Sequence, residues 1–195
     1  MKYYQREGLL PEGEKSAPNQ TSYDQNHVQR VRLIRALLGT GGLSIAATKS
    51  VIAALDTAPL PEVFGVAQHA MSAPRPNEGE ARPASKNQVL ALARAQGWRI
   101  TESNPGIEAA ARALDGLHAI GFDAPDAYLS AYATAAATTA AADLQALASL
   151  PTPEQQAELM VVGTVLGDPL FAALRRLAQQ DATYDRFPIE PKAEQ

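Results

Sequence analysis

The chain opens with MKYYQREGLLP at residues 1–11, where two tyrosines and a mixed set of charges precede Gly8 and a Leu-Leu-Pro step. The next segment, GEKSAPN at residues 13–19, is rich in turn-forming residues. Residues 20–23 then have the composition of a short strand, and we predict that this strand pairs with residues 8–10. The opening of the chain therefore predicts a loop followed by a small two-stranded ribbon.

Two short helices are predicted after the ribbon. Asp24 suits a helix N-cap, and apolar residues recur at helical spacing until the glycines of residues 39–42: Val28, Val31, Ile34, Leu37 and Leu38. The polar face of this helix carries Arg30 and Arg32. Ser44 can cap the second helix, which ends before Pro59 and has an apolar face of Ala47, Val51, Ile52 and Leu55.

Several motifs in this order resemble the MerR family of bacterial transcription regulators: YYQREGLLP at 3–11, Ser22-Tyr23-Asp24, VQRVRLIRAL at 28–37 and Leu43-Ser44-Ile45. In that family the first motif joins the DNA-recognition helix to the wing. The resemblance implies a mainly α protein that begins with a truncated winged helix-turn-helix module over residues 1–57, followed by an all-helical domain.

The resemblance also implies which residues contact double-stranded DNA. Lys2, Tyr4 and Arg6 are expected to bind phosphates, because cations release condensed counterions and a tyrosine hydroxyl adds a directional hydrogen bond. Tyr23 is expected to act from the wing. One of the two tyrosines at positions 3 and 4 instead packs under the wing, since adjacent helical residues point in different directions.

The chain departs from the family pattern in two places. The family's wing usually carries a Tyr-Arg pair where this chain has Gln20 and Thr21, so we expect weaker and less salt-sensitive wing contacts. The resemblance also implies a first helix, a turn and most of the recognition helix before Met1. We expect a chain that starts here to read bases poorly. A longer gene product, a trimmed form and a true truncation all remain open explanations.

Charge is distributed unevenly along the 195 residues. The net charge is −4, which alone argues against nucleic acid. Residues 1–56 hold seven Lys or Arg against five Asp or Glu, about +2, while the rest hold ten against sixteen, about −6. The basic excess thus coincides with the MerR-like segment, although a difference of two charges is also compatible with chance.

The rest of the chain is predicted to be helical. A helix is expected at 61–71, and a linker with three prolines at 72–83. Five later helices are expected: at 86–96, after Asn104-Pro105, from Asp123 and Pro125 to about Leu150, after Thr152-Pro153, and after Asp168-Pro169. Ser85 is expected to cap the first of these. The predicted divisions are 1–57, the helix and flexible linker of 58–84, an effector-binding and dimerisation domain at 85–187, and a tail at 188–195.

Candidate ligand and dimer surfaces lie in this helical part. Trp98, Tyr128 and Tyr132 could line an apolar hollow for a small-molecule effector, or be ordinary core aromatics. Residues 133–142 hold seven alanines and three threonines, which suits either the central helix of the domain or a self-associating pair of helices. Because residues 58–83 lack a heptad pattern, we expect a homodimer to form through the carboxyl-terminal helices.

Other functions find little support in the sequence. The absence of cysteine excludes thiolate metal sites, and His27, His69 and His118 lack a second ligand at metal spacing, so no metal or other cofactor is expected. No enzyme motif is present. Residues 127–150 are the most apolar long window but too weakly hydrophobic to span a membrane, and we expect a cytoplasmic protein.

Two functions therefore remain open from the sequence. The first is a DNA-binding transcription regulator that senses a small molecule and distorts its duplex. The second is a protein that sequesters a small molecule and has lost DNA binding together with its first helix. DNA-binding assays at low and high salt, on this chain and on one extended upstream, distinguish the two.

Overall fold

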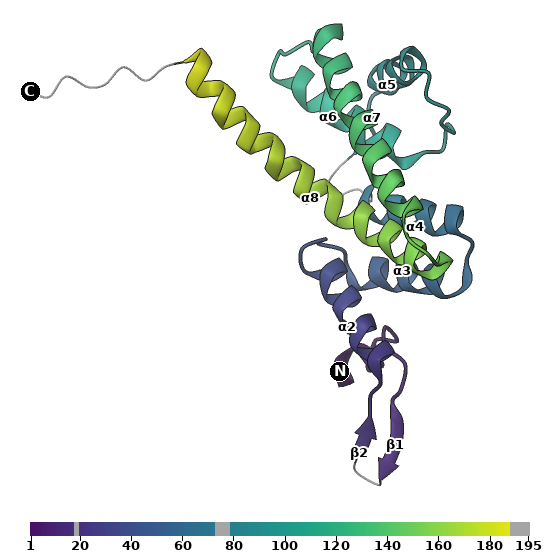
Figure 1. The fold of residues 1–195 in the computed structure, drawn as a ribbon. Coiled ribbons are helices and arrows are strands. Elements are labelled where there is room, and N and C mark those ends of the chain that lie inside the picture. Colours follow the sequence, from purple (N-terminus) through teal and green to yellow (C-terminus); the bar gives the residue numbers. More distant parts are fainter. Residues whose placement is uncertain (18–19, 73–78, 188–195) are drawn as a thin grey trace, which may run out of the picture. The chain divides into compact units, whose positions relative to one another are not determined.

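The computed structural model describes residues 1–17, 20–72 and 79–187, and it is mainly helical (Figure 1). The chain divides into two compact units, one formed by residues 1–42 with 162–195 and the other by residues 43–161. The mainly α fold expected from the sequence is confirmed.

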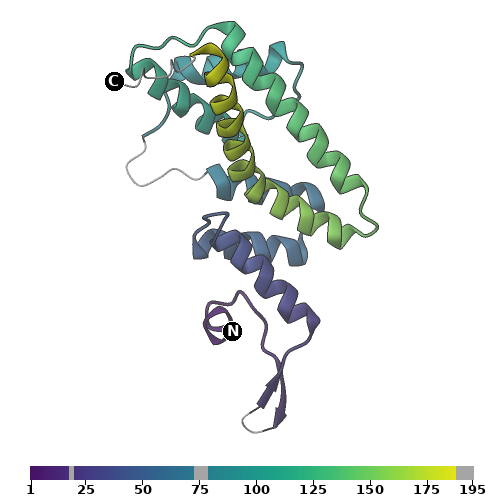
Figure 2. The ribbon, with the colours of Figure 1, turned by 60° about the vertical axis from the view of Figure 1, so that its left-hand side comes forward.

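The amino-terminal part of the first unit combines two helices with a ribbon, in the order α1 (Lys2–Arg6), β1 (Glu14–Ala17), β2 (Gln20–Ser22) and α2 (Gln25–Leu38). The two strands pair antiparallel, with Glu14 opposite Ser22 and Lys15 opposite Thr21. The ribbon extends beyond the amino-terminal end of α2 and away from α1, as both views show (Figure 1 and Figure 2). The predicted ribbon therefore exists.

The predicted strand partner, residues 8–10, is wrong. Leu9 and Leu10 are buried in the core, and the Leu9 N–H donates to the Tyr4 carbonyl at 2.8 Å, so these residues close α1. Burial of two leucines stabilises the fold more than an exposed strand pairing would. β1 takes the place of residues 8–10 as the partner of β2. β1 occupies most of the segment predicted as turn-rich; residues 18 and 19 lie outside the described part of the chain.

The predicted cap of α2 is confirmed, and of its predicted apolar face Ile34 and Leu37 are buried, whereas Val28, Val31 and Leu38 are partly buried. Asp24 accepts a hydrogen bond from the His27 N–H at 2.9 Å, and the helix ends at Gly39. Its buried residues are Leu33, Ile34 and Leu37. Gly41, just after the helix, lies directly against Val165, so that a Cβ on Gly41 would overlap the valine side chain.

The last two helices predicted from the sequence are one continuous helix, α8 (Pro153–Arg186), with Pro169 inside it. Proline removes one backbone donor, yet the turns on both sides are long enough to keep the helix continuous. Asp168 therefore does not start a new helix. Desolvation by its surroundings raises the pKa of its carboxyl.

Among the described residues, one helix is long and apolar enough by length and composition to cross a membrane, and it is α8. This is weak evidence, because some helices of soluble proteins pass the same test. The candidate window does not coincide with residues 127–150, which the sequence pointed to. The sequence-based prediction divided residues 153–186 into two helices at Pro169, and neither of these is as long as the apolar helix that the structure contains.

The second unit is built from α3 (Ile45–Thr57), α4 (Leu60–Ser72), α5 (Pro83–Ala95), α6 (Pro105–Ala119), α7 (Asp126–Ala148) and the first residues of α8. α3 packs on α4, α4 on α6, α6 on α5 and α5 on α7. The core around α5, α6 and α7 contains Leu114, Ala124 and Leu129, with Val89, Leu92 and Leu117 packed against them.

Several local signals are confirmed in this unit. Ser44 caps α3 and Asn104 caps α6 through their side-chain oxygens. Gly97 and Gly121, which follow α5 and α6, have φ of +69° and +79°, the left-handed conformation that glycine adopts most readily after a helix. These signals depend on neighbours in sequence, which explains why they could be predicted.

Two expectations about this unit are wrong. Ser85 does not cap α5, which begins two residues earlier, and its buried side chain instead faces α6. α7 is not the central helix, because only Leu129, Ala133 and Leu147 of its residues are buried. The central place belongs to α6, which packs against both α4 and α5.

The two compact units divide the chain differently from the sequence-based domains. α3 belongs with the later helices because it packs on α4, and α4 is part of a folded unit because it also packs on α6. The functional division into 1–57, 58–84, 85–187 and 188–195 stays a prediction. Residues 73–78 of the expected linker and the expected tail lie outside the described residues.

Candidate functional site

The cations expected to meet DNA lie on α1. Lys2 and Arg6 are exposed and one turn apart, so they share a face of the helix. The Arg6 guanidinium lies over the Tyr3 ring at 5.4 Å, and its Nε is 3.8 Å from the Glu7 carboxylate. Cation–π contact of this kind holds the guanidinium in place but leaves its donors available.

The two tyrosines of α1 differ in exposure. Tyr3 is 47% exposed, whereas Tyr4 is partly buried, and the two rings are 5.7 Å apart. Tyr4 is therefore the more buried of the two, and the packing of one tyrosine under the wing stays a prediction. The expected role of Tyr4 as a phosphate contact stays a prediction, and Tyr3 is the tyrosine that the sequence analysis did not select.

The ribbon joins the rest of the module at Gly13 and Tyr23. A Cβ on Gly13 would lie 2.5 Å from the Ser22 carbonyl oxygen, so this position needs a glycine for the close approach of the chain to β2. Tyr23, the residue directly after β2, is partly buried and packs edge-on against the His27 ring at 5.4 Å. The base of the ribbon is thus fixed by local packing.

α2 adds two exposed cations, Arg32 and Arg35, at positions one turn apart. Asp24 at the start of the helix keeps its negative charge, because hydrogen bonds from the His27 N–H and from the His27 ring lower the pKa of its carboxyl. The module therefore presents guanidinium and ammonium groups that can bind phosphate oxygens. Arg35 is a candidate the sequence analysis did not single out, although its exposed helical position was readable from the periodicity.

The expected effector residues are only partly brought together. Tyr128 and Tyr132 lie one turn apart on α7, with hydroxyl oxygens 3.1 Å apart and rings 4.8 Å apart. Phe122 packs edge-on against Tyr128 at 5.7 Å. Trp98, which follows α5, has no ring contact with them among the described residues. The three residues therefore do not form one continuous wall.

Two cavities of about 360 and 350 Å³ open on the second unit. The larger lies between α5 and α7, with Leu92 and Leu129 as its apolar floor and Gln88, Gln96 and Asp126 among its polar residues. The smaller is lined by Lys86, Glu108 and Arg112, among others. None of the three expected effector residues lines either of these cavities.

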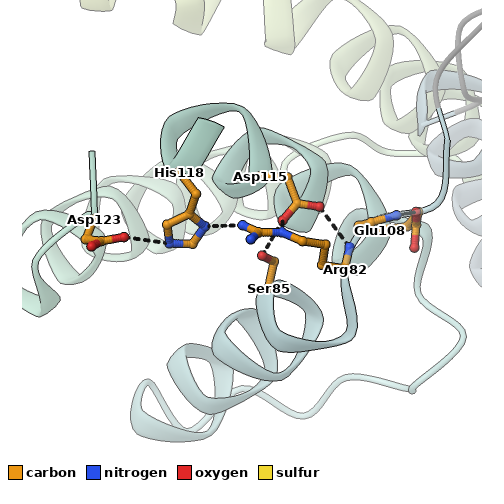
Figure 3. Close-up of polar contacts among 7 residues, drawn as sticks. Arg82, Ser85, Glu108, Asp115, His118 and Asp123 are labelled. Carbon is orange, nitrogen blue, oxygen red and sulfur yellow. Dashed lines mark hydrogen bonds and ion pairs between the residues drawn. The ribbon is translucent and has the colours of Figure 1, made fainter. Parts of the chain in front are cut away.

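A polar cluster joins α5 to α6 (Figure 3). Asp115 accepts hydrogen bonds from the Arg82 backbone N–H at 2.8 Å, from the Arg82 Nε at 2.7 Å and from the Ser85 hydroxyl. Arg82 also donates to His118 Nδ1 at 2.7 Å, and His118 Nε2 faces Asp123 at 3.5 Å. The carboxylate thus serves as the cap that the first turn of α5 lacks in its own sequence.

A second carboxylate of α6 lies two turns earlier and acts in the same way. Glu108 accepts from the Ala81 N–H at 2.6 Å and pairs with Lys86 at 2.7 Å and Arg112 at 3.3 Å. These donors, Lys86 first, lower the pKa of Glu108, and Glu108 raises the pKa of Lys86. The Ser85 hydroxyl and the Arg82 groups hold the pKa of Asp115 at about 2.

The chemistry of this cluster is structural. Each polar group faces a complementary partner of the chain itself, and the acceptors point at the first turn of α5, where backbone donors have no intrahelical partner. The sequence does not reveal the cluster, because the partners that join α6 to α5 and the residues before it are 22 to 36 residues apart. Among the described residues, no group of three His, Cys, Asp or Glu is placed to hold a metal ion.

Comparison with known proteins agrees with the amino-terminal module. Residues 1–55 match the family model described as a MerR HTH family regulatory protein. The fold is similar to the crystal structure of a "putative transcriptional regulator" from Streptomyces coelicolor A3(2), with a TM-score of 0.72 and 27% identity over 98% of this chain and 92% of that chain. No curated protein matches the chain. The amino-terminal module of the chain is therefore similar to that of MerR HTH family regulatory proteins.

Proposed function

We propose that the chain is a DNA-binding transcription regulator that meets double-stranded DNA with α1, the ribbon and α2. The observation that carries the proposal is the exposed cation pair of α1, in which Lys2 and Arg6 lie on one face and Arg6 is held over Tyr3. Two cations at this spacing can each neutralise a phosphate and fix the position of the module on the duplex.

Tyr4 and Tyr23 are proposed to add hydrogen bonds to the DNA backbone. Tyr23 stands at the base of the ribbon, where its partly buried ring has few conformations to lose on binding. Thr21 is exposed on β2 and offers a neutral hydroxyl. The ribbon is therefore expected to act as a wing that contributes register more than salt-dependent affinity.

The regulator is proposed to act as a homodimer through α8. The carboxyl-terminal half of this helix exposes large apolar residues at spacings of four, three and seven: Leu170, Leu174, Leu177 and Tyr184. This is the spacing of a coiled-coil seam. A stripe of this kind is stabilised when a second helix covers it.

The charges of α8 favour an antiparallel pair. Arg175 and Arg176 precede Asp181 and Asp185 along the helix, so a basic part is followed by a part that is mainly acidic, with Arg186 at its end. Two copies related by a two-fold axis perpendicular to the helices place the basic part of each opposite the acidic part of the other, whereas a parallel pair aligns like charges. The occupant of the stripe is therefore a second copy of the chain.

Effector sensing is proposed for the second unit. The cavity between α5 and α7 is of the size of small-ligand sites and combines an apolar floor with a few polar groups. The exposed aromatic residues Tyr128 and Tyr132 offer a second surface for a small molecule on α7, the helix that also borders the cavity. Trp98 offers a separate exposed surface. Binding that favours one of two conformations of a dimer would change its affinity for DNA.

The alternative is a protein that binds a small molecule without regulating a promoter. The second unit has a core of its own around Leu114 and Leu129, and this observation favours the alternative.

A transcription regulator requires access to the chromosome, so we also propose a cytoplasmic location.

Selection from a random-sequence duplex library tests the choice between the two. A regulator enriches related sequences with two-fold symmetry, because a symmetric dimer reads two half-sites. A variant with Lys2→Gln and Arg6→Gln loses that enrichment, while Arg94→Gln, which removes an exposed cation of α5, keeps it. Absence of enrichment by the folded wild-type dimer would support the sequestering protein.

A further inference from the structure

His27 connects the ribbon to α2 through contacts on two sides. Its ring packs edge-on against Tyr23, with ring centres 5.4 Å apart and planes at 73°. Its Nδ1 is 2.5 Å from the Asp24 Oδ1. The side chain is only 12% exposed, although it sits in the first turn of a helix. A single imidazole therefore touches both the helix cap, Asp24, and the residue before it, Tyr23.

The partners of the ring define which nitrogen carries a proton. A contact of 2.5 Å with a carboxylate oxygen requires a proton between the two atoms, so Nδ1–H donates to Asp24. The Asp24 backbone N–H, at 3.4 Å from the same nitrogen, is a longer contact. Nε2 is buried and has no hydrogen-bond partner among the described residues. The ring is thus fixed by one strong hydrogen bond and by packing.

The same carboxylate is also the cap of α2, because it accepts from the His27 N–H at 2.9 Å. Asp24 therefore ties the backbone and the ring of His27 to the start of the helix, and the ring in turn limits the positions open to Tyr23. Tyr23 follows β2 directly, so the direction in which the ribbon leaves α2 depends on this stack of side chains.

We propose that His27 is a positioning residue for DNA binding, which holds Tyr23 and with it the ribbon in the orientation that meets the duplex. This inference rests on the proposed function, since Tyr23 is the residue it serves. His27 itself does not touch DNA. Its effect on affinity passes entirely through the Tyr23 ring, so removing the tyrosine removes the contribution of the histidine.

Two substitutions separate positioning from helix capping. His27→Gln places a glutamine at the third helical position after an Asp cap, where it can return a hydrogen bond to the Asp24 N–H and keep the helix start, but it has no ring for Tyr23. His27→Phe keeps a ring against Tyr23 and loses the hydrogen bond to Asp24. The first variant tests positioning, and the second tests rescue by an aromatic ring.

DNA affinity is measured for both variants on a duplex obtained by selection with the wild-type protein. His27→Gln is expected to weaken binding about tenfold while the thermal midpoint of unfolding stays near the wild-type value. His27→Phe is expected to recover most of the affinity despite a lower midpoint. In a Tyr23→Leu background, His27→Gln should add less than about a twofold change, because coupled residues are not additive.

The free protein provides a test that does not depend on DNA. Proton NMR should show cross-relaxation between the Tyr23 and His27 rings, and His27→Gln should broaden or shift the Tyr23 ring signals. If the wild-type protein binds no duplex, the proposed function fails, and the Tyr23 signals still decide whether His27 orders the ring. Unchanged Tyr23 signals in His27→Gln, or an equal loss of affinity with and without Tyr23, would overturn the inference.

Discussion

Arg82 and Asp115 are joined by two hydrogen bonds, one from the Arg82 backbone N–H at 2.8 Å and one from its Nε at 2.7 Å. The arginine thus binds α6 with its main chain and its side chain at once. Because Arg82 is also the N-cap residue of α5 and has no side-chain cap of its own, Asp115 completes that helix from another part of the chain.

Replacement of Asp115 by asparagine should lower the stability of the second unit. The amide keeps the shape of the side chain but loses the negative charge, and its NH2 group cannot accept from Ser85 or Arg82. We expect the thermal midpoint to fall by several degrees in differential scanning calorimetry. Glu102→Gln, an exposed change in the turn before α6, serves as the control and should leave the midpoint unchanged.

The same carboxylate should make stability depend on acidity. The pKa of Asp115 is lowered from 3.8 to about 2 in the folded chain, chiefly by the Ser85 hydroxyl and then by Arg82. A lowered pKa means that the contribution to the free energy of unfolding is complete above about pH 4 and is lost as the pH falls toward about 2.

Urea unfolding measured across that pH range checks the dependence. Asp115→Asn should show a shallower decline than the wild type, because it has no carboxyl to protonate. Parallel curves for the two proteins would mean that the pKa of Asp115 is not lowered.

Gly41→Ala should destabilise the first unit. The added methyl would overlap Val165 and lie 2.7 Å from the Leu37 carbonyl oxygen, and backbone cannot move aside cheaply. We expect a loss of about 1–3 kcal/mol in the free energy of unfolding, as for other overpacked sites.

The matched control for this change is Gly65→Ala in α4. No atom lies within 4 Å of its added methyl, so alanine should stabilise the helix by about 0.4–1 kcal/mol. Chemical denaturation of both variants gives the comparison. Equal effects at the two positions would show that Gly41 does not pack against Val165.

Leu174→Glu should dissociate the proposed dimer. Burial of a leucine contributes about 2 kcal/mol, and a two-fold dimer contains the site twice, so the dissociation constant should rise on the order of 1,000-fold. Gln179→Glu adds the same charge on the opposite face of α8 and should leave the dimer intact. Sedimentation equilibrium measures both, and a wild-type monomer at all concentrations would rule out the α8 interface.

The features predicted correctly from the sequence are those that depend on near neighbours. Asp24, Ser44 and Asn104 bind backbone groups two or three residues away, so the residue type alone identified these caps. The family motifs of the first 45 residues are similarly local. They were sufficient to indicate a resemblance to the MerR family, which the match over residues 1–55 confirms for that segment.

The features that the sequence could not predict depend on distant partners. Ser85 has the chemistry of a cap, but Asp115, thirty residues later, binds its hydroxyl. Residues 8–10 could pair in a ribbon, but Leu9 and Leu10 are buried instead. Proline usually ends a helix, but α8 continues through Pro169. In each case packing overrode a local preference.

The candidate DNA interface likewise has features that the sequence predicts and features that only the structure reveals. Lys2 and Arg6 could be selected from the sequence because the resemblance to the MerR family implies that basic residues at the end of the recognition helix contact DNA, and the structure places both on one face of α1. The choice between Tyr3 and Tyr4 required the structure, since it depends on which ring the core covers. The link from Tyr23 through His27 to Asp24 also emerged only from the packing of the rings.

The salt dependence of DNA binding tests the central claim most directly. The logarithm of the binding constant should fall linearly with the logarithm of salt concentration, with a slope of about −0.9 for each phosphate neutralised. Lys2→Gln and Arg6→Gln should each make the slope less steep by about 0.9 per module, and the control Arg94→Gln should leave it unchanged. Slopes identical to the wild type in both α1 variants would contradict the placement of α1 on the duplex.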